Sequence, residues 1–466
     1  MRRLTAALLS VIMTVTSGIL PAFSQGRPAL PLIRDAEIEH ILASYATPVI
    51  RGAGLDVDAV RIHIVNDDTL NAFVANGQRI FVNTGLILAT ETPGQLVGVL
   101  AHETGHIRGG HLIATRDAIS RAQTYSLVAT LLGLAAVVAG ASSGGNTQAG
   151  TAALLGGQAV GQQSFLQYSQ LQESAADQTG AILMEKAGWS PKGLVEFLEI
   201  LGRNEGALTS SSDRFNRTHP LSEDRIARLK SRVQHSSLRD HKASAEVVFA
   251  HQMMQAKIFG FIKKPDVTLR KYPVRDTSAP ARYARAVAYH KQALTDKAMA
   301  EMDSLIAEQP ENAYFHELKG QILLESSRID GAVTSLNRAN DLLPHPTISA
   351  LLARALVATG KPGDQQRAGS LLKAVVQLEP DHIGAWRTLS RIFGAAGNHG
   401  MASLTSAEAY FHAGQLPFAL EQASRALRVL PQNSPAYYRA SDIRNAVLNQ
   451  TRPGETLSPG QGGDRR

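Results

Sequence analysis

The sequence predicts an α+β domain, mostly helical with a small sheet, followed by an all-α solenoid built from helix pairs. The first half alternates short strand-like segments with amphipathic helices, whereas the last third contains only helical segments that recur at a fixed spacing. A chain of 466 residues is long enough for two or three such domains. The hydrophobic fraction of 44% argues against wholesale disorder and against a polytopic membrane protein.

Residues 1–24 have the pattern of a secretory signal peptide. Arg2 and Arg3 give a positive start, the run from Leu4 to Leu20 is mostly apolar, and Ala22-Phe23-Ser24 fits a cleavage site. An uncleaved anchor is the alternative, and in either case the rest of the chain is exported. We therefore expect the protein in a bacterial periplasm, with a possible association with the membrane.

Residues 25–235 are predicted to form the α+β domain. Helical spacing covers residues 34–52, and alternation over residues 60–65 predicts a strand. Two further strand-like runs flank Asn76-Gly77, a dipeptide that favours a tight hairpin turn.

A helix containing LVGVLAHETGHIRGGH is predicted to begin after Thr92. Thr92 is a good N-cap, Pro93 suits the first helical position, and Gln95 can close a capping box. A second helix is expected over about residues 164–186, and Trp189-Ser190-Pro191 indicates the start of another.

The basic residues are concentrated in a connector, residues 236–282. This stretch has 9 basic and 4 acidic residues, whereas residues 25–235 have 17 basic and 19 acidic residues. Positive stretches can attract anionic lipid or nucleic acid. We expect no nucleic acid for an exported protein, and the simplest interpretation of residues such as Lys257 is a solvated face. The uncharged apolar run over residues 126–141 is short for a membrane span and favours a buried helix or membrane-surface contact.

Residues 283–450 repeat with a period near 34. Three prolines close helical segments at intervals of 34 and 36 residues: Pro310, Pro344 and Pro380. The segments between them read as helix pairs: 314–326 with 329–342, and 349–359 with 366–378. This pattern is the tetratricopeptide signature, and such repeats stack into a curved solenoid with a groove. We expect about four repeats, followed by a disordered tail at residues 451–466.

The chain has no cysteine, which excludes disulfides, cysteine nucleophiles, zinc fingers and thiolate-bound clusters. Any metal must therefore be held by His, Asp or Glu. The dominant motif of this kind is His102-Glu103-Thr104-Gly105-His106. On a helix, His102 and His106 project from one face, where two imidazoles can bind one zinc ion, and Glu103 can take a proton from the attacking water.

Zinc catalysis needs a third protein ligand. A third His six residues after His106 would complete an extended motif, but that position is Leu112, and His111 lies on another face as a packing or outer-contact residue. Glu173, on the predicted downstream helix, is the better candidate, although spacing alone leaves a solvent-facing position equally open. Asp177 lies one turn further on and can orient a ligand imidazole.

Three motifs in order resemble the membrane-associated zincin family that includes HtpX and the CaaX prenyl proteases. They are HETGH, then ESAADQTG from Glu173, then Thr218-His219-Pro220 with Arg225 following. With a signal peptide in front and tetratricopeptide repeats behind, the chain is most similar to the periplasmic, BepA-like type of that family. The resemblance covers residues 34–232 for the peptidase. It implies a zincin-type metallopeptidase fold with one Zn²⁺ per chain.

The resemblance also implies a role for each site residue. The zinc ligands would be His102, His106 and Glu173, with Glu103 as the general base and with Asp177 and Arg225 supporting the ligands. His219 would face the metal, either stabilising the tetrahedral oxyanion or closing the fourth position at rest, and a helix-capping His is the alternative. The family binds substrate as an added strand, and the matching segment contains Asn71, Phe73, Arg79, Ile80 and Phe81.

The expected function is therefore that of an exported zinc metalloendopeptidase acting on misfolded or misassembled envelope proteins. The repeats would recognise these polypeptides or a partner such as the outer-membrane assembly machinery. The first alternative is a chaperone or assembly factor for outer-membrane proteins, with latent or secondary peptidase activity. A second alternative is a membrane-surface adaptor that uses the connector and residues 126–141 for peripheral membrane contact.

Overall fold

The structure is a computed structural model that describes residues 30–75, 77–115, 117, 168–205, 219 and 222–450. The expected signal peptide, the apolar run at 126–141 and the tail at 451–466 lie outside these residues. The described residues from Leu32 onward belong to one compact unit. Among the described residues, none of the helices has both the length and the apolar character that a membrane span requires.

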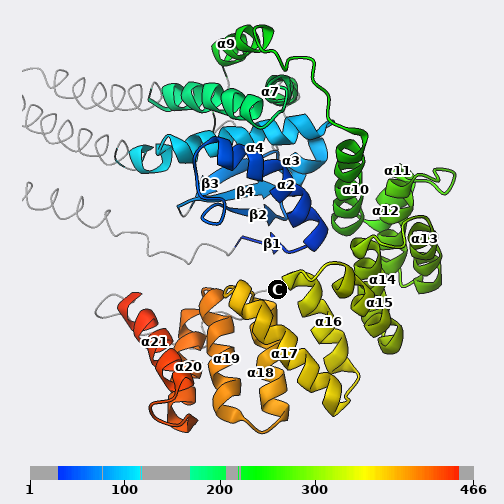
Figure 1. Cartoon of the computed structure of the whole chain (residues 1–466), viewed down its shortest axis with the longest axis vertical. Coiled ribbons are helices and arrows are strands. Elements are labelled where there is room, and N and C mark those ends of the chain that lie inside the picture. The colour runs from blue at the N-terminus through cyan, green and yellow to red at the C-terminus, as the bar shows by residue number, and fades with distance from the viewer. Residues whose placement is uncertain are drawn as a thin grey trace, which may run out of the picture. The chain divides into compact units, whose positions relative to one another are not determined.

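A four-stranded sheet is formed near the start of the described chain (Figure 1). Its strands are β1 (Leu32–Ile33), β2 (Arg61–Val65), β3 (Ala72–Ala75) and β4 (Arg79–Asn83), in the order β1-β2-β4-β3. β3 and β4 pair antiparallel, which confirms the predicted hairpin, and Gly77 in the turn has a φ of 91° that favours glycine. β2 pairs parallel with β4, a long-range pairing that the sequence did not predict.

The two faces of the sheet have different surroundings. Ile64, Ile80 and Val82 belong to the buried core that the sheet shares with the helices of this domain. Side chains alternate along a strand, so their neighbours point to the other face. There, Phe81 stacks between Phe73 and His63, with ring centroids 5.1 and 5.0 Å away.

The helices of this domain are α2 (Ala36–Gly52), α3 (Thr84–Ala89), α4 (Pro93–Arg108), an unlabelled helix over residues 168–186, α7 (Lys192–Glu205) and α9 (Glu223–Gln234). α2, α3 and α4 pack against the strands, whereas α7 packs on α4 and α9 packs on α7. In α4 every residue from Leu96 to Gly105 is buried. The motif helix is therefore enclosed by neighbouring elements rather than lying on the surface.

The capping of α4 differs from the expectation in one respect. Thr92 occupies the N-cap and Pro93 the first turn, but the Thr92 side chain makes no capping hydrogen bond. The side-chain oxygen of Gln95 accepts instead from the backbone N–H of Glu91 at 2.7 Å. The predicted capping box is therefore wrong, because Gln95 reaches one residue beyond the N-cap.

Glycines bring the neighbouring helices very close to α4. A Cβ atom on Gly98 would lie 2.7 Å from Cα of Leu194 in α7, and one on Gly105 would lie 2.9 Å from the carbonyl oxygen of Ala176. A Cβ on Gly180 would lie 3.1 Å from the backbone nitrogen of His102. These close approaches hold the helix over residues 168–186 against the motif helix.

The basic connector contains α10 (Ala245–Ile262) and α11 (Pro265–Lys271). The helix α10 contributes Met254 and Ile258 to the core of the α+β domain and Met253 to the core of the repeats. Lys257 is 1% exposed and lies 2.8 Å from Asp35. The expectation of a solvated face is therefore wrong for Lys257, which is buried among carboxylates.

After α11 the described chain forms five successive helix pairs, which Figure 1 colours from green to red. The helices are α12 (Ala279–Lys291), α13 (Thr295–Glu308), α14 (Ala313–Glu325), α15 (Ile329–Leu342), α16 (Pro346–Ala358), α17 (Pro362–Leu378), α18 (Ile383–Ala395), α19 (His399–His412), α20 (Leu416–Val429) and α21 (Pro435–Gln450). The helix-pair pattern is confirmed, but the described residues hold five pairs where the sequence predicted about four.

Candidate metal centre

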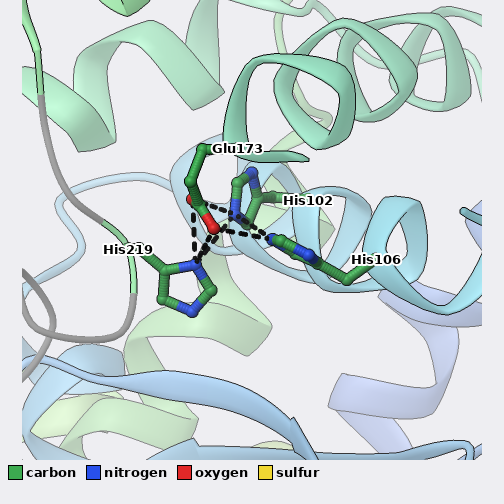
Figure 2. A group of neighbouring side chains, drawn as sticks. All are labelled: His102, His106, Glu173 and His219. Carbon is green, nitrogen blue, oxygen red and sulfur yellow. Dashed lines mark hydrogen bonds and ion pairs between the residues drawn. The ribbon is translucent and has the colours of Figure 1, made fainter. Parts of the chain in front are cut away.

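Four side chains from three parts of the chain meet beside α4 (Figure 2). His102 and His106 lie one turn apart on α4, with their Nε2 atoms 3.0 Å from each other. The Glu173 carboxylate lies 3.4 Å from Nε2 of His102 and 3.3 Å from Nε2 of His106. His219 directs Nδ1 to the same point, 3.0 Å from Glu173 Oε2 and 3.3 Å from His102 Nε2. One ligand atom from each residue lies within 4.8 Å of the others.

This donor set fits a zinc ion. Ligand atoms about 2.0–2.1 Å from a tetrahedral zinc lie roughly 3.4 Å from one another. Five of the six separations between these ligand atoms lie between 3.0 and 3.4 Å, close to that value. Three nitrogens and a carboxylate oxygen are also the ligand types that zinc takes when no thiolate is present.

Asp177 and Arg225 hold the ligands from behind. Nδ1 of His102 contacts Oδ1 of Asp177 at 2.9 Å, which fixes the ring with Nε2 toward the centre. Arg225 donates to both oxygens of Asp177, at 2.7 and 2.9 Å, and lies 3.2 Å from Glu173. Ser222 caps α9 by accepting from the backbone N–H of Arg225, so the start of this helix delivers the guanidinium. All three charged groups are buried.

Burial and charge act on the ligands in opposite directions. Burial alone would lower the pKa of His102, but its hydrogen bonds to Asp177 and Glu173 outweigh burial and raise the pKa to about 10. For His106 burial wins, and the pKa falls to about 3. Burial would raise the pKa of Glu173, yet the charge of His219 and hydrogen bonds from three histidines hold it far below its usual range. His106 and Glu173 therefore present the neutral imidazole and the carboxylate that a metal needs.

Glu103 faces the same space from α4 and is fully buried. Its Oε1 lies 3.5 Å from Nε2 of His219. Burial raises the pKa of Glu103, and this is opposed by His219, by His102 and by the backbone of Val74 in β3. The carboxylate thus lies between the donor set and the edge of the sheet.

The strand residues suggested by the resemblance are divided between two strands. Arg79, Ile80 and Phe81 lie in β4, which has β2 on one side and β3 on the other. A strand paired on both sides has no free backbone groups for another strand. Phe73 lies in β3, at the edge of the sheet, and Asn71 directly precedes β3.

The register identifies the outward-facing backbone of β3. The N–H of Asn83 donates to the carbonyl of Asn71, and bonded and non-bonded pairs alternate along an antiparallel ladder. The backbone of Phe73 is therefore directed to β4, and the backbones of Ala72 and Val74 are directed to the open edge. The sequence alone could not tell which residues of β3 direct their backbone groups to the open edge, because this depends on which residues of β3 and β4 pair.

A further contact joins the centre to His111. Its Nδ1 lies 3.0 Å from Nδ1 of His106, on the side of the ring away from Glu173. The sequence left His111 as either a packing residue or an outer contact of the site, and the structure supports the second description.

Residues 33–233 match peptidase family M48. The chain is 26% identical over 410 residues to the beta-barrel assembly-enhancing protease of Escherichia coli (strain K12), covering 86% of this chain and 81% of that protein. It is 26% identical over 405 residues to the protein of that name from Yersinia pestis, covering 85% of this chain and 80% of that protein.

A third relative matches a shorter part of the chain. The mitochondrial metalloendopeptidase OMA1 of Saccharomyces cerevisiae is 30% identical over 206 residues, covering 42% of this chain and 54% of that protein. The crystal structure of a TPR protein from Thermus thermophilus matches 42% of this chain and 91% of its own, at 16% identity and a TM-score of 0.25, which is too low to support a fold assignment.

The sequence match and the converging His and Glu side chains agree with the family resemblance seen in the sequence. Residues 33–233 thus resemble peptidase family M48 both in sequence and in their converging side chains, and the chain is a metalloendopeptidase similar along most of its length to the beta-barrel assembly-enhancing proteases.

Proposed function

We propose that the protein is a zinc-dependent endopeptidase of zincin type that works in the periplasm on misfolded or misassembled envelope proteins. The observation that carries the zinc assignment is the convergence of His102, His106 and Glu173 within tetrahedral distance of one another. When bound, zinc polarises the scissile carbonyl and lowers the pKa of a water molecule toward about 7.

The chain's own residues supply the proton transfers. Glu103 is the general base: it takes a proton from the attacking water and delivers it to the leaving amine. Its buried carboxylate, close to the donor set and 3.5 Å from His219, supports this role. Asp177 and Arg225 keep His102 and Glu173 in position throughout the reaction.

Substrate is proposed to bind as an extended strand along β3. The backbones of Ala72 and Val74 face away from β4, and the backbone of Val74 contacts Glu103, which places this edge beside the general base. A peptide paired there would pass directly in front of the donor set. In this proposal Phe73 and Asn71 shape the edge, whereas Arg79, Ile80 and Phe81 support it from β4.

Two roles fit the position of His219. With Nδ1 among the candidate ligand atoms, His219 would hold the metal as a fourth ligand at rest and would move away when substrate arrives. Alternatively it stays near Glu103 and stabilises the oxyanion. A His219→Ala variant separates these roles, because loss of a plug raises the cleavage rate and loss of an oxyanion donor lowers it.

The helical repeats are proposed to recognise substrate or the outer-membrane assembly machinery. The relatives that match 86% of this chain are named for beta-barrel assembly, which supports an envelope location. The second candidate function is a chaperone or assembly factor with latent peptidase activity, which is favoured by the position of His219 in the donor set.

The Glu103→Gln variant tests the peptidase assignment. The variant should keep its zinc, because Glu103 is not a ligand, and should lose at least about 100-fold in the cleavage rate of an unfolded outer-membrane protein, since general-base catalysis contributes on the order of 10²–10⁴. Cleavage by the variant at the wild-type rate would contradict the peptidase assignment.

The same variant separates the two candidate functions in cells. If Glu103→Gln restores outer-membrane assembly to a strain that lacks the protein, the chaperone role carries the function. If only the wild type restores outer-membrane assembly, peptide cleavage carries the function. The control is Glu91→Gln, a change of the same kind at an exposed position just before α4.

A further inference from the structure

His106 has an unusual partner on the side away from the donor set. Its Nδ1 lies 3.0 Å from Nδ1 of His111, and the two rings are nearly perpendicular, at 80° with centroids 4.9 Å apart. The other ligand histidine, His102, uses the carboxylate of Asp177 at the equivalent place. Each of the two ligand rings therefore has a partner at Nδ1, a carboxylate for His102 and an imidazole for His106.

A pair of glycines brings His111 back onto the helix. The last residue of α4 is Arg108, and Gly110 has a φ of 63°, a left-handed conformation that reverses the chain direction. Gly109 has an ordinary φ of −75°, but a Cβ atom there would overlap the ring of His111. A larger residue at either position would therefore disturb the placement of His111.

The chain after the turn is anchored to the helix that carries Glu173. The N–H groups of Ile113 and Ala114 donate to the carbonyl of Gly110 and start a new helical turn. Thr115 donates to the side chain of Gln172 at 2.9 Å. Gln172 in turn reaches the carbonyl of His111 at 3.5 Å, which fixes the position of His111 relative to the ligand helix.

The chemistry of a ligand imidazole requires such a partner. A neutral histidine that binds a metal through Nε2 carries its proton on Nδ1, and this N–H must donate a hydrogen bond. Nδ1 of His111 is a nitrogen acceptor at hydrogen-bond distance. The bond fixes both the tautomer and the ring rotation of His106.

We propose that His111 is a positioning residue of the metal centre, which accepts a hydrogen bond from Nδ1–H of His106 and is held in place by the Gly109-Gly110 turn. This inference rests on the proposed zinc centre. Outer partners of zinc ligands typically contribute about 10–100-fold to metal affinity. His111 should therefore act on zinc affinity itself, before any effect on cleavage.

The test measures the zinc affinity of the full chain by competition with a chelator. We expect His111→Ala to weaken zinc binding by about 10–100-fold. His111→Asn, whose side-chain oxygen can accept in place of Nδ1, should recover most of that affinity. Gly109→Ala, which displaces the ring without changing its chemistry, should weaken zinc binding in the same way as His111→Ala.

Two controls complete the test. Gly94→Ala places the same methyl group on α4, where its nearest neighbours would be 3.9 Å away, and should leave zinc affinity unchanged. The thermal unfolding of the metal-free variants should match that of the wild type. Zinc affinities of His111→Ala and Gly109→Ala within twofold of the wild type would overturn this inference, whereas a wild type that binds no zinc would overturn the proposed function itself.

Discussion

At the scale of single residues, burial decides the chemistry of His251. This histidine of α10 is 1% exposed, its Nε2 lies 3.2 Å from Oγ1 of Thr90, and its ring stacks on Tyr45. Burial removes the water that would stabilise a charged imidazole, and it lowers the pKa to about 4. His251 is therefore neutral in the folded protein at every pH near 7.

This shift predicts a loss of stability in mild acid. The unfolded chain protonates His251 near pH 6.5, whereas the folded chain does so near pH 4, so the stabilisation is complete above pH 6.5 and is lost as the pH falls toward 4. At pH 5 the single group costs about 2 kcal/mol of unfolding free energy. His251→Gln should therefore reduce the difference in stability between pH 7 and pH 5.

Trp189 provides the probe for this measurement, because its ring lies 5.8 Å from that of Tyr45, the neighbour of His251. Replacing the second tryptophan, Trp386, by Phe leaves Trp189 fluorescence to report unfolding of this domain. His241→Gln, an exposed histidine, is the control. An acid sensitivity as large in His251→Gln as in the wild type would refute the assignment.

The motif residues were predictable because their spacing is local. His102 and His106 share a face of any helix, so their convergence follows from the sequence. Spacing did not predict that the Glu173 side chain faces the two histidines, since this depends on how two helices far apart in the sequence pack. The sequence favoured Glu173 as the third ligand but left a solvent-facing position equally open, and only the resemblance to a family gave Glu173 that role and added His219 to the site.

At the scale of elements, close helix packing sets the site. The backbone of Ala176 lies against Gly105, and Gly180 lies against the backbone of His102. This contact carries Glu173 and Asp177 on one helix to the face of the other that holds the histidines. The elements themselves were predictable, but the parallel pairing of β2 with β4 was not, because the residues between them give no signal for it.

The sequence predicted about four repeats, whereas the described residues hold five helix pairs. Prolines follow the first three pairs, but the turn after α19 is made by Gly414, with a φ of 70°, and has no proline. Glycine in the left-handed conformation commonly ends a helix. The next proline, Pro431, lies between α20 and α21, so the interval from Pro380 to Pro431 spans one and a half pairs and proline spacing alone undercounts them.

At the scale of the whole molecule, Lys257 joins the peptidase to the repeats. Its Nζ lies 2.8 Å from Asp35, 3.3 Å from Glu37 at the start of α2 and 3.4 Å from Glu317 in α14. Tyr283 of α12 donates to Glu37 at 2.7 Å. The sequence could not reveal this cluster, because the partners of Lys257 lie far before and after it in the chain.

Removing this lysine should be costly. Lys257→Met leaves buried carboxylates without their counter-charge, and breaking a buried ion pair typically costs about 3–5 kcal/mol. Lys263→Met is the matched control: its ion pair with Asp68 is on the surface and should be worth no more than about 1 kcal/mol. Denaturant unfolding of the two variants measures both values, and equal losses would contradict the structural role of Lys257.

The ligand set is tested most directly by the zinc content of the purified full chain, determined by elemental analysis. The wild type should hold one zinc per chain, and Glu173→Ala should hold close to none. Glu185→Ala, on the same helix but paired with Arg232 away from the site, should keep the full zinc content. One zinc per chain in Glu173→Ala, or none in the wild type, would contradict the proposed metal centre.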